Sequence, residues 1–167
     1  SAIAAASPYL VLEQRIINID RGQKFFAQDF LQFSDKMLAG GRIPNGVNQI
    51  KKHAAIFARA EQQYGVPPPV IAAFWGLESD FGAYMGKDHA LRALATLAYD
   101  CRRPEFFTEQ LYAALKLIDR GWLSPSARGA MHGEVGQTQF LPKNIMLYGT
   151  GGNLNNKSIA LASTANF

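Results

Sequence analysis

Residues 67–79, Pro-Pro-Pro-Val-Ile-Ala-Ala-Phe-Trp-Gly-Leu-Glu-Ser, decide the fold of this chain. The prolines preset the backbone for the start of a helix. The run from Val70 to Ser79 that follows is apolar on nearly every side until Glu78. A helix that is apolar all round lies in the interior of a protein. We therefore predict a central helix over about 70–79, with a single carboxylate near its end.

Apolar residues at intervals of three and four predict further helices on both sides of this segment. One begins near Phe26 and ends at Gly40-Gly41, and another covers about 48–64. Helices are also predicted around 91–98, from Pro104 to Gly121, and over 157–167, whereas the glycine-rich segments 129–136 and 149–152 are predicted loops. Strand-like alternation is weak. The fold class is mainly α.

Composition restricts the class of protein. The chain has 167 residues, 48% of them hydrophobic, with 17 Lys+Arg against 13 Asp+Glu. This balance indicates a folded domain, and the net charge of +4 permits an anionic partner such as nucleic acid, anionic lipid or a wall polymer. The single cysteine, Cys101, excludes an intrachain disulfide. No apolar run is long enough to span a membrane, and Ser1–Ser7 is interpreted as a trimmed mature end.

Several common functional signals are absent from the sequence. The segment Gly82–Asp88 resembles a phosphate-binding loop, but its glycines are one residue too close together and Asp88 replaces Ser or Thr. The three histidines are far apart, so we expect no metal site and no cofactor. Basic residues form only pairs, so we expect no nucleic-acid binding.

Glu78 is the first candidate catalytic residue. It ends a run that is otherwise free of charge, and an apolar setting raises the pKa of a carboxyl group. A raised pKa lets a carboxylic acid donate a proton near neutral pH. The alternative is a glutamate at a fraying helix end that points into water.

The segment Gly133-Glu-Val-Gly-Gln-Thr-Gln-Phe-Leu-Pro142 is the second candidate. The side-chain amides of Gln137 and Gln139 can donate and accept hydrogen bonds, so both could bind one polar ligand such as an N-acetylated sugar. The alternative is an ordinary glycine-rich turn before a helix.

Together these segments resemble the lytic transglycosylases of the membrane-bound lytic transglycosylase B family. The similarity covers about Asp20 to the end, and each motif is modest while their order is specific. The resemblance implies a lysozyme-like helical transglycosylase domain with a smaller helical part. We expect an N-terminal extension over 1–19 and the catalytic domain over 20–167, truncated at its C-terminus because the helical pattern is still running at Phe167. The matching residues are Tyr64-Gly-Val-Pro-Pro68, Trp75-Gly-Leu-Glu-Ser-Asp-Phe-Gly82, Met85-Gly86, Ala93-Leu-Ala-Thr-Leu-Ala-Tyr-Asp100, Arg102-Arg103, Phe106-Phe107, Gly136-Gln-Thr-Gln-Phe-Leu-Pro142, Tyr148 and Ala162-Ser-Thr-Ala-Asn166.

The resemblance also implies an activity. Members of this family cleave peptidoglycan between N-acetylmuramic acid and N-acetylglucosamine and leave a 1,6-anhydro end. Glu78 falls on their single acid/base, and the substrate's own 6-hydroxyl takes the place of water. We expect peptidoglycan strands as the partner, a periplasmic monomer, and membrane association only through an anchor outside this chain. Arg102, Arg103, Gln139 and Asn166 fall on positions that line the glycan groove, and Tyr148 falls on a tyrosine whose role we leave open.

Three departures from the family pattern keep alternatives open. Ala130 stands where many relatives carry a serine, and Glu134 replaces a small residue. The segment 149–156 is shorter than the calcium-loop-like insertion of some relatives and has no carboxylate. Glu134 either points to solvent or pairs with an arginine, or it lies near Glu78 and raises its pKa. The alternative functions are a water-using muramidase with Glu134 as second carboxylate, and a non-catalytic peptidoglycan-binding or assembly module.

Overall fold

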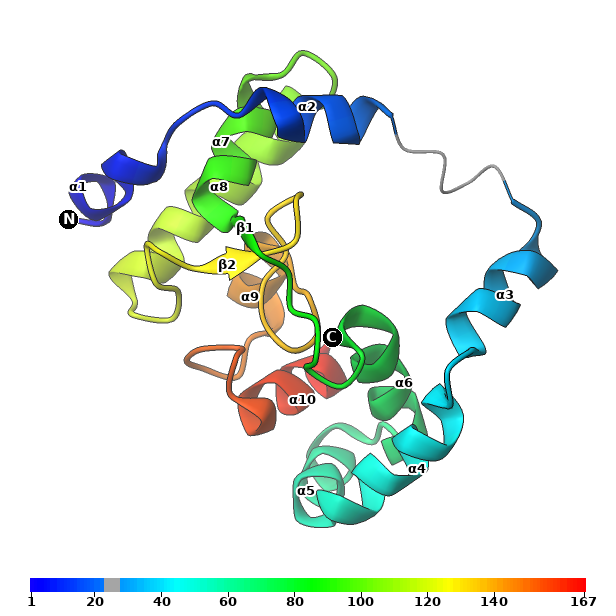
Figure 1. Ribbon diagram of the computed structural model, residues 1–167. Coiled ribbons are helices and arrows are strands. Elements are labelled where there is room, and N and C mark those ends of the chain that lie inside the picture. Colours follow the sequence, from blue (N-terminus) through cyan, green and yellow to red (C-terminus); the bar gives the residue numbers. More distant parts are fainter. Residues whose placement is uncertain (23–27) are drawn as a thin grey trace.

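The structure, a computed structural model, describes residues 1–22 and 28–167 and is mainly helical (Figure 1). None of the described helices is long and apolar enough to cross a membrane. Strands β1 (Asp88–His89) and β2 (Arg128–Gly129) pair antiparallel, with Asp88 opposite Gly129. The helices are α1 (Ala2–Ala6), α2 (Gln14–Arg21), α3 (Phe30–Leu38), α4 (Arg42–Lys52), α5 (Ala54–Tyr64), α6 (Pro68–Ser79), α7 (Ala90–Tyr99), α8 (Pro104–Asp119), α9 (Pro142–Tyr148) and α10 (Lys157–Asn166), and a 3-10 turn, η1, covers Ser7–Tyr9.

The larger hydrophobic cluster lies between α7 and α8, with α1, α2 and α9 around this pair. Its fully buried members include Leu94 on α7 and Leu117 on α8. Ala6 and Ile16 also enter this cluster, so the segment 1–19 packs against the rest of the chain. The division of the chain at residue 20 stays a prediction.

The smaller hydrophobic cluster joins α5, α6 and α10. Phe57, Trp75 and Leu161 from these three helices are each almost completely buried. Helix α10 also contacts α9, so it links the smaller cluster to the larger one. Figure 1 shows the loop that follows β2 between the two groups of helices.

Helix α6 confirms the predicted element and corrects one expectation about it. It begins at Pro68 and buries Ile71, Ala72 and Trp75 against α4, α5 and α10. Phe74 and Leu77 on its other side remain 43% and 48% exposed. The expectation of a helix enclosed on all sides is therefore wrong, because its neighbours cover only one face.

Two other predicted helices have different bounds. The helix expected over about 48–64 is two helices, α4 and α5, which break at His53, where φ is −117° and ψ is 28°. Helix α3 begins at Phe30 because the Asp29 carboxylate accepts a hydrogen bond from the Gln32 backbone N–H as an N-cap. Phe26, from which the sequence pattern started, lies outside the described residues.

Gly129 in β2 lies where the backbone of the following loop returns, and a Cβ atom there would lie 1.8 Å from the carbonyl oxygen of Glu134. We expect Gly129→Ala to lower the free energy of unfolding by about 3 kcal/mol, because neither the backbone at Gly129 nor that at Glu134 can move without strain. Gly65→Ala is the control, because Gly65 has a φ of +71° and open space around it; it should cost about 1 kcal/mol from backbone strain alone. Urea denaturation measures both. Equal losses would contradict the close approach.

Candidate active site

The C-terminal end of α6, which carries Glu78, has an unusual and well-anchored backbone. Asp80 and Phe81 both have positive φ, 49° and 59°. Their N–H groups donate to the carbonyls of Gly76 and Trp75 at 3.0 and 3.2 Å. The Phe81 ring packs edge-on against the Trp75 ring, with 5.5 Å between centroids. This packing stabilises a conformation that non-glycine residues seldom adopt.

A buried network of hydrogen bonds joins this helix end to the loop 130–141. The Trp75 indole N–H donates to Gln137 Oε1 at 2.8 Å, and Gln137 Nε2 donates to the Asn155 carbonyl at 3.2 Å. The Ser79 hydroxyl donates to the Gln137 carbonyl and accepts from the Gly82 N–H. Gln137 is buried and bonded at both ends of its amide. The structure thus places it among the residues that hold the loop, contrary to its expected place at a ligand-binding surface.

Glu78 lies in the last turn of α6, and its side chain reaches solvent. Partial burial raises the pKa of its carboxyl group, and the negative charge of Glu134 raises that pKa further. No other described residue forms a hydrogen bond or an ion pair with this carboxyl. Glu78 is therefore a carboxyl group that holds its proton to higher pH than an ordinary glutamate and has no protein partner among the described residues.

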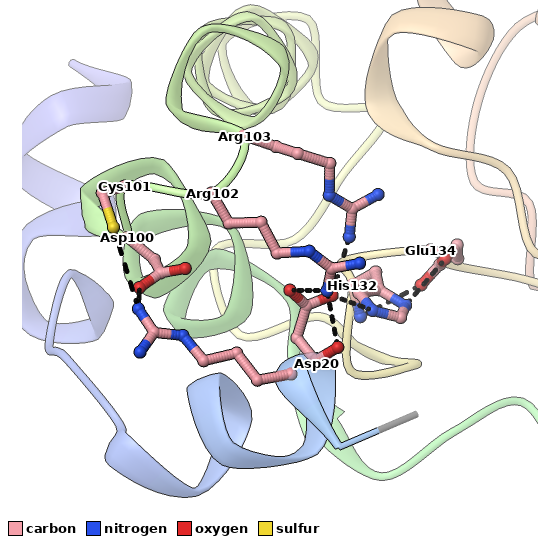
Figure 2. Close-up of polar contacts among 8 residues, drawn as sticks. Asp20, Asp100, Cys101, Arg102, Arg103, His132 and Glu134 are labelled. Atoms are coloured by element: carbon pink, nitrogen blue, oxygen red, sulfur yellow. Dashed lines mark hydrogen bonds and ion pairs between the residues drawn. The ribbon is translucent and has the colours of Figure 1, made fainter. Parts of the chain in front are cut away.

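Asp20 lies at the centre of a charged network beside this loop (Figure 2). Its side chain is 3% exposed. Arg102 donates to Asp20 Oδ2, and Arg103 to Oδ1, both at 2.7 Å. His132 Nε2 lies 2.9 Å from the same Oδ1. Burial raises the pKa of the Asp20 carboxyl, but the His132 hydrogen bond and the charges of Arg103 and Arg102 outweigh it, so the net pKa is lowered.

The network continues from His132 to Glu134. His132 Nδ1 lies 3.6 Å from Glu134 Oε1, and the His132 backbone N–H donates to Oε2 at 3.2 Å. The hydrogen bond with Glu134 raises the pKa of His132; burial opposes this shift, and the charges of Glu134 and Asp20 reinforce it. Of the interpretations of Glu134, the structure thus supports the one that places its charge near Glu78, and its partner is a histidine rather than an arginine.

Arg102 and Arg103 were expected to line a glycan groove. The structure anchors one side of each guanidinium group on Asp20, while the side chains remain 50% and 42% exposed. A guanidinium group has five N–H donors. Each arginine thus keeps donors that face outward, and both can still bind an anion while their positions are fixed.

The other expected ligand-binding residues lie at two places. Gln139 Nε2 donates to the carbonyls of Met85 and Gly136 at 3.1 and 2.8 Å, which leaves its amide oxygen as an acceptor. Asn166 Nδ2 donates to the Tyr148 carbonyl at 2.9 Å, and the Tyr148 ring packs edge-on against Phe167. Phe167 in turn contacts Phe140 at 5.6 Å between centroids. Tyr148 and Asn166, the last residues of α9 and α10, are thus held together.

Asp20 and His132 are the site residues that sequence reasoning missed. Asp20 marked only the start of a similarity, and His132 was one of three isolated histidines. Their side chains are in contact although they are 112 residues apart in the sequence. The substitution of Glu134 for a small residue was the only local signal, since an added carboxylate close to Glu78 requires a compensating cation.

Comparisons with known proteins identify the family and the fold of this chain. The family described as the transglycosylase SLT domain matches residues 1–167. Membrane-bound lytic murein transglycosylase B of Escherichia coli K12 is 33% identical over 121 residues, which are 71% of this chain and 34% of that protein. SltB3 from Pseudomonas aeruginosa, solved with NAG-NAM-pentapeptide, is 33% identical and superposes with a TM-score of 0.92 over 99% of this chain and 46% of its own. The Escherichia coli lytic transglycosylase Slt35, solved with bulgecin A, is 29% identical with a TM-score of 0.82 over 92% and 52%.

The chain thus spans about a third of the curated relative and about half of the two solved structures.

Asp20→Asn should lower the free energy of unfolding by about 2 kcal/mol, because two arginines and His132 lose a charged acceptor. The lowered pKa of Asp20 makes its contribution present above its ordinary pKa of 3.8, with loss as pH falls further. The raised pKa of His132 makes its contribution complete below 6.5, with loss as pH rises through the raised value. The difference from wild type should thus be largest between about pH 4 and 6.5. Urea denaturation at several pH values tests this.

Asp35→Asn is the matched control for Asp20→Asn. Asp35 lies on α3, is exposed, and forms no ion pair with a described residue. It should leave stability unchanged at every pH. A loss for Asp20→Asn that is equal at pH 5.5 and pH 9 would contradict the part assigned to His132.

Chelators test the expectation that no metal is needed. The described residues contain no group of three or more His, Cys, Asp or Glu side chains that could hold an ion. We expect EDTA to change neither the melting temperature nor the activity. A fall in melting temperature that calcium reverses would contradict this expectation.

Proposed function

The chain belongs to the transglycosylase SLT family, and from this premise we propose that it is a lytic transglycosylase of peptidoglycan, with Glu78 as its only acid/base. The bond cleaved is the β-1,4 bond from N-acetylmuramic acid to N-acetylglucosamine, and the product carries a 1,6-anhydromuramyl end. The observation that carries the proposal is Glu78 itself. It is a solvent-reached carboxyl with a raised pKa and no described hydrogen-bond or ion-pair partner, at the end of an anchored helix.

The reaction needs this carboxyl in both of its states. Protonated Glu78 donates its proton to the glycosidic oxygen as the bond from that oxygen to the muramyl C1 breaks. The 6-hydroxyl of the same sugar then forms a bond to C1, and its proton passes to the Glu78 carboxylate. The acid is regenerated and no water is consumed. A raised pKa favours the first step, because it increases the fraction of Glu78 that carries a proton at a given pH.

Charged and amide groups around Glu78 suit the rest of such a substrate. The outward donors of Arg102 and Arg103 could bind lactyl or peptide carboxylates of the wall. The free amide oxygen of Gln139 could accept a hydrogen bond from an N-acetyl group, and Tyr148 and Asn166 could contact the glycan at the other end of the loop. The Pseudomonas SltB3 complex holds a glycan with a pentapeptide, which supports this ligand class. We propose the periplasm as the compartment, and a monomer stays a prediction.

A water-using muramidase is the second candidate, because Glu134 acts electrostatically on Glu78. In such an enzyme Glu134 would remove a proton from water. Its carboxylate, however, faces both the His132 ring and the His132 backbone N–H. A carboxylate held by these two contacts is not free to position a water molecule. The geometry therefore favours the anhydro product. A non-catalytic binding module would show no turnover.

Glu78→Gln should keep the fold and the binding of glycan strands while kcat falls by at least about 1,000-fold, since general acid–base catalysis contributes on this scale. Stability should not fall, because a raised carboxyl pKa means that the charged form is disfavoured in the folded state. Mass spectrometry of muropeptides after digestion measures both the turnover and the product.

Glu61→Gln is the control, since Glu61 is exposed on α5; it should behave like wild type. Substantial residual activity in Glu78→Gln would contradict a single acid/base. Products with free reducing ends would identify a muramidase.

A further inference from the structure

We propose that His132 is a positioning residue: it bridges Asp20 and Glu134, and this bridge fixes the Glu134 carboxylate where its charge acts on Glu78. The inference rests on the proposed function, because it concerns the state of the acid/base. In this proposal three linked side chains, Asp20, His132 and Glu134, hold a negative charge in a fixed position near Glu78. None of these three is itself required to touch the substrate.

The geometry of the bridge requires a doubly protonated ring. His132 Nε2 lies 2.9 Å from Asp20 Oδ1, and Nδ1 lies 3.6 Å from Glu134 Oε1. An ionised carboxylate can only accept hydrogen bonds, so each ring nitrogen must carry a proton to interact favourably. The ring also stacks on Phe107, with 6.3 Å between centroids and an interplanar angle of 21°. Contacts from α8, α2 and the loop thus fix the plane of the ring.

The charges around the bridge agree with an imidazolium. The hydrogen bond with Glu134 raises the pKa of His132, against the effect of burial. The other charged groups of the network, Arg102 and Arg103, also donate to Asp20, and Arg103 shares the Oδ1 atom with His132. With Asp20 and Glu134 negative, and His132 and both arginines positive, each carboxylate of the network has a cationic partner.

The consequence for Glu78 follows from the series of contacts from Asp20 through His132 to Glu134. Among the described residues, Glu134 is the charged group that raises the pKa of Glu78. At position 130 an alanine offers no hydroxyl, and its N–H donates to the Glu134 carbonyl at 2.9 Å. A fixed negative charge therefore replaces a directional hydrogen bond at this site. If His132 holds that charge in place, loss of His132 must act through Glu134 and add nothing once Glu134 is neutral.

The test is a double-mutant cycle of His132→Phe and Glu134→Gln, read as the pH dependence of kcat/KM for glycan cleavage. Phenylalanine keeps a ring that can stack on Phe107 and removes both the hydrogen bond to Asp20 and the ion pair with Glu134. We expect each single change to lower the pKa of Glu78. The basic limb of the pH profile of kcat/KM then moves to lower pH. Above neutral pH, kcat/KM then falls by about tenfold for each pH unit that the limb moves. We expect the double variant to match Glu134→Gln, since residues that act through one another are not additive.

Matched controls separate this effect from general damage. His89→Phe makes the same replacement at a ring whose two nitrogens have no hydrogen-bond partner among the described residues. Glu109→Gln removes an exposed carboxylate that is ion-paired with Lys143. Both should keep the wild-type pH profile. A wild-type profile for His132→Phe, or additive effects in the double variant, would overturn the proposal.

An NMR titration of the His132 ring gives a readout that does not depend on turnover. In the wild-type chain the ring should stay protonated above its ordinary pKa of 6.5, and Glu134→Gln should lower its midpoint. An unchanged midpoint would show that the two residues are not coupled, and would overturn the proposal even if His132→Phe failed to fold. The titration also separates the two hypotheses: full activity of Glu78→Gln would end the proposed function, whereas the midpoint reports only on the bridge.

Discussion

The buried Asp20 carboxylate holds together three parts of the chain that are far apart in sequence: the end of α2, the turn between α7 and α8, and the loop that follows β2 (Figure 2). An ionised carboxylate away from water costs several kcal/mol unless its oxygens are hydrogen-bonded and its charge is neutralised. Arg102, Arg103 and His132 do both, and Arg102 also donates to the Asp20 backbone carbonyl at 2.6 Å. Because the loss of any partner would leave charge uncompensated, the position of His132 is strongly determined. The position of Glu134, two residues further along, then follows from it.

A second anchor fixes the same loop from the opposite side. Gln137 accepts from the Trp75 indole and its backbone carbonyl accepts from Ser79, both on α6. Glu134 thus lies between an ionic anchor at His132 and a neutral, buried anchor at Gln137. Glu78 is in the last turn of the helix that the second anchor holds. The relative placement of the two carboxylates is therefore set by the protein on both sides of the loop, and a buried network in which every member is bonded is rigid.

Local signals predicted part of this architecture. The helix over 70–79 was predictable from its prolines and apolar run, and the one from Pro104 from its periodicity, because both depend on neighbours in sequence. The raised pKa of the Glu78 carboxyl was predictable, because this carboxylate ends an apolar run; its catalytic role stays a prediction. Gln137 was misjudged, since alternation with Gln139 indicated a shared ligand, whereas the buried Trp75 N–H needed an acceptor. The Asp20–His132 contact had no local signal, because nothing in either segment specifies a partner 112 residues away.

A carboxylate at position 134 would act on the proposed acid/base, Glu78, differently from a hydroxyl at position 130. A hydroxyl orients its partner through one short hydrogen bond and is neutral at every relevant pH. A carboxylate acts through its charge, which reaches further in a partly buried site and is screened less there than at an open surface. Its effect also depends on its own counter-ion, so it varies with the protonation of His132. In the mechanism that we propose, the acid/base Glu78 is thus coupled, through His132, to the ion pairs that hold α2 on the domain. The same interactions that stabilise the fold therefore set the charge that acts on Glu78.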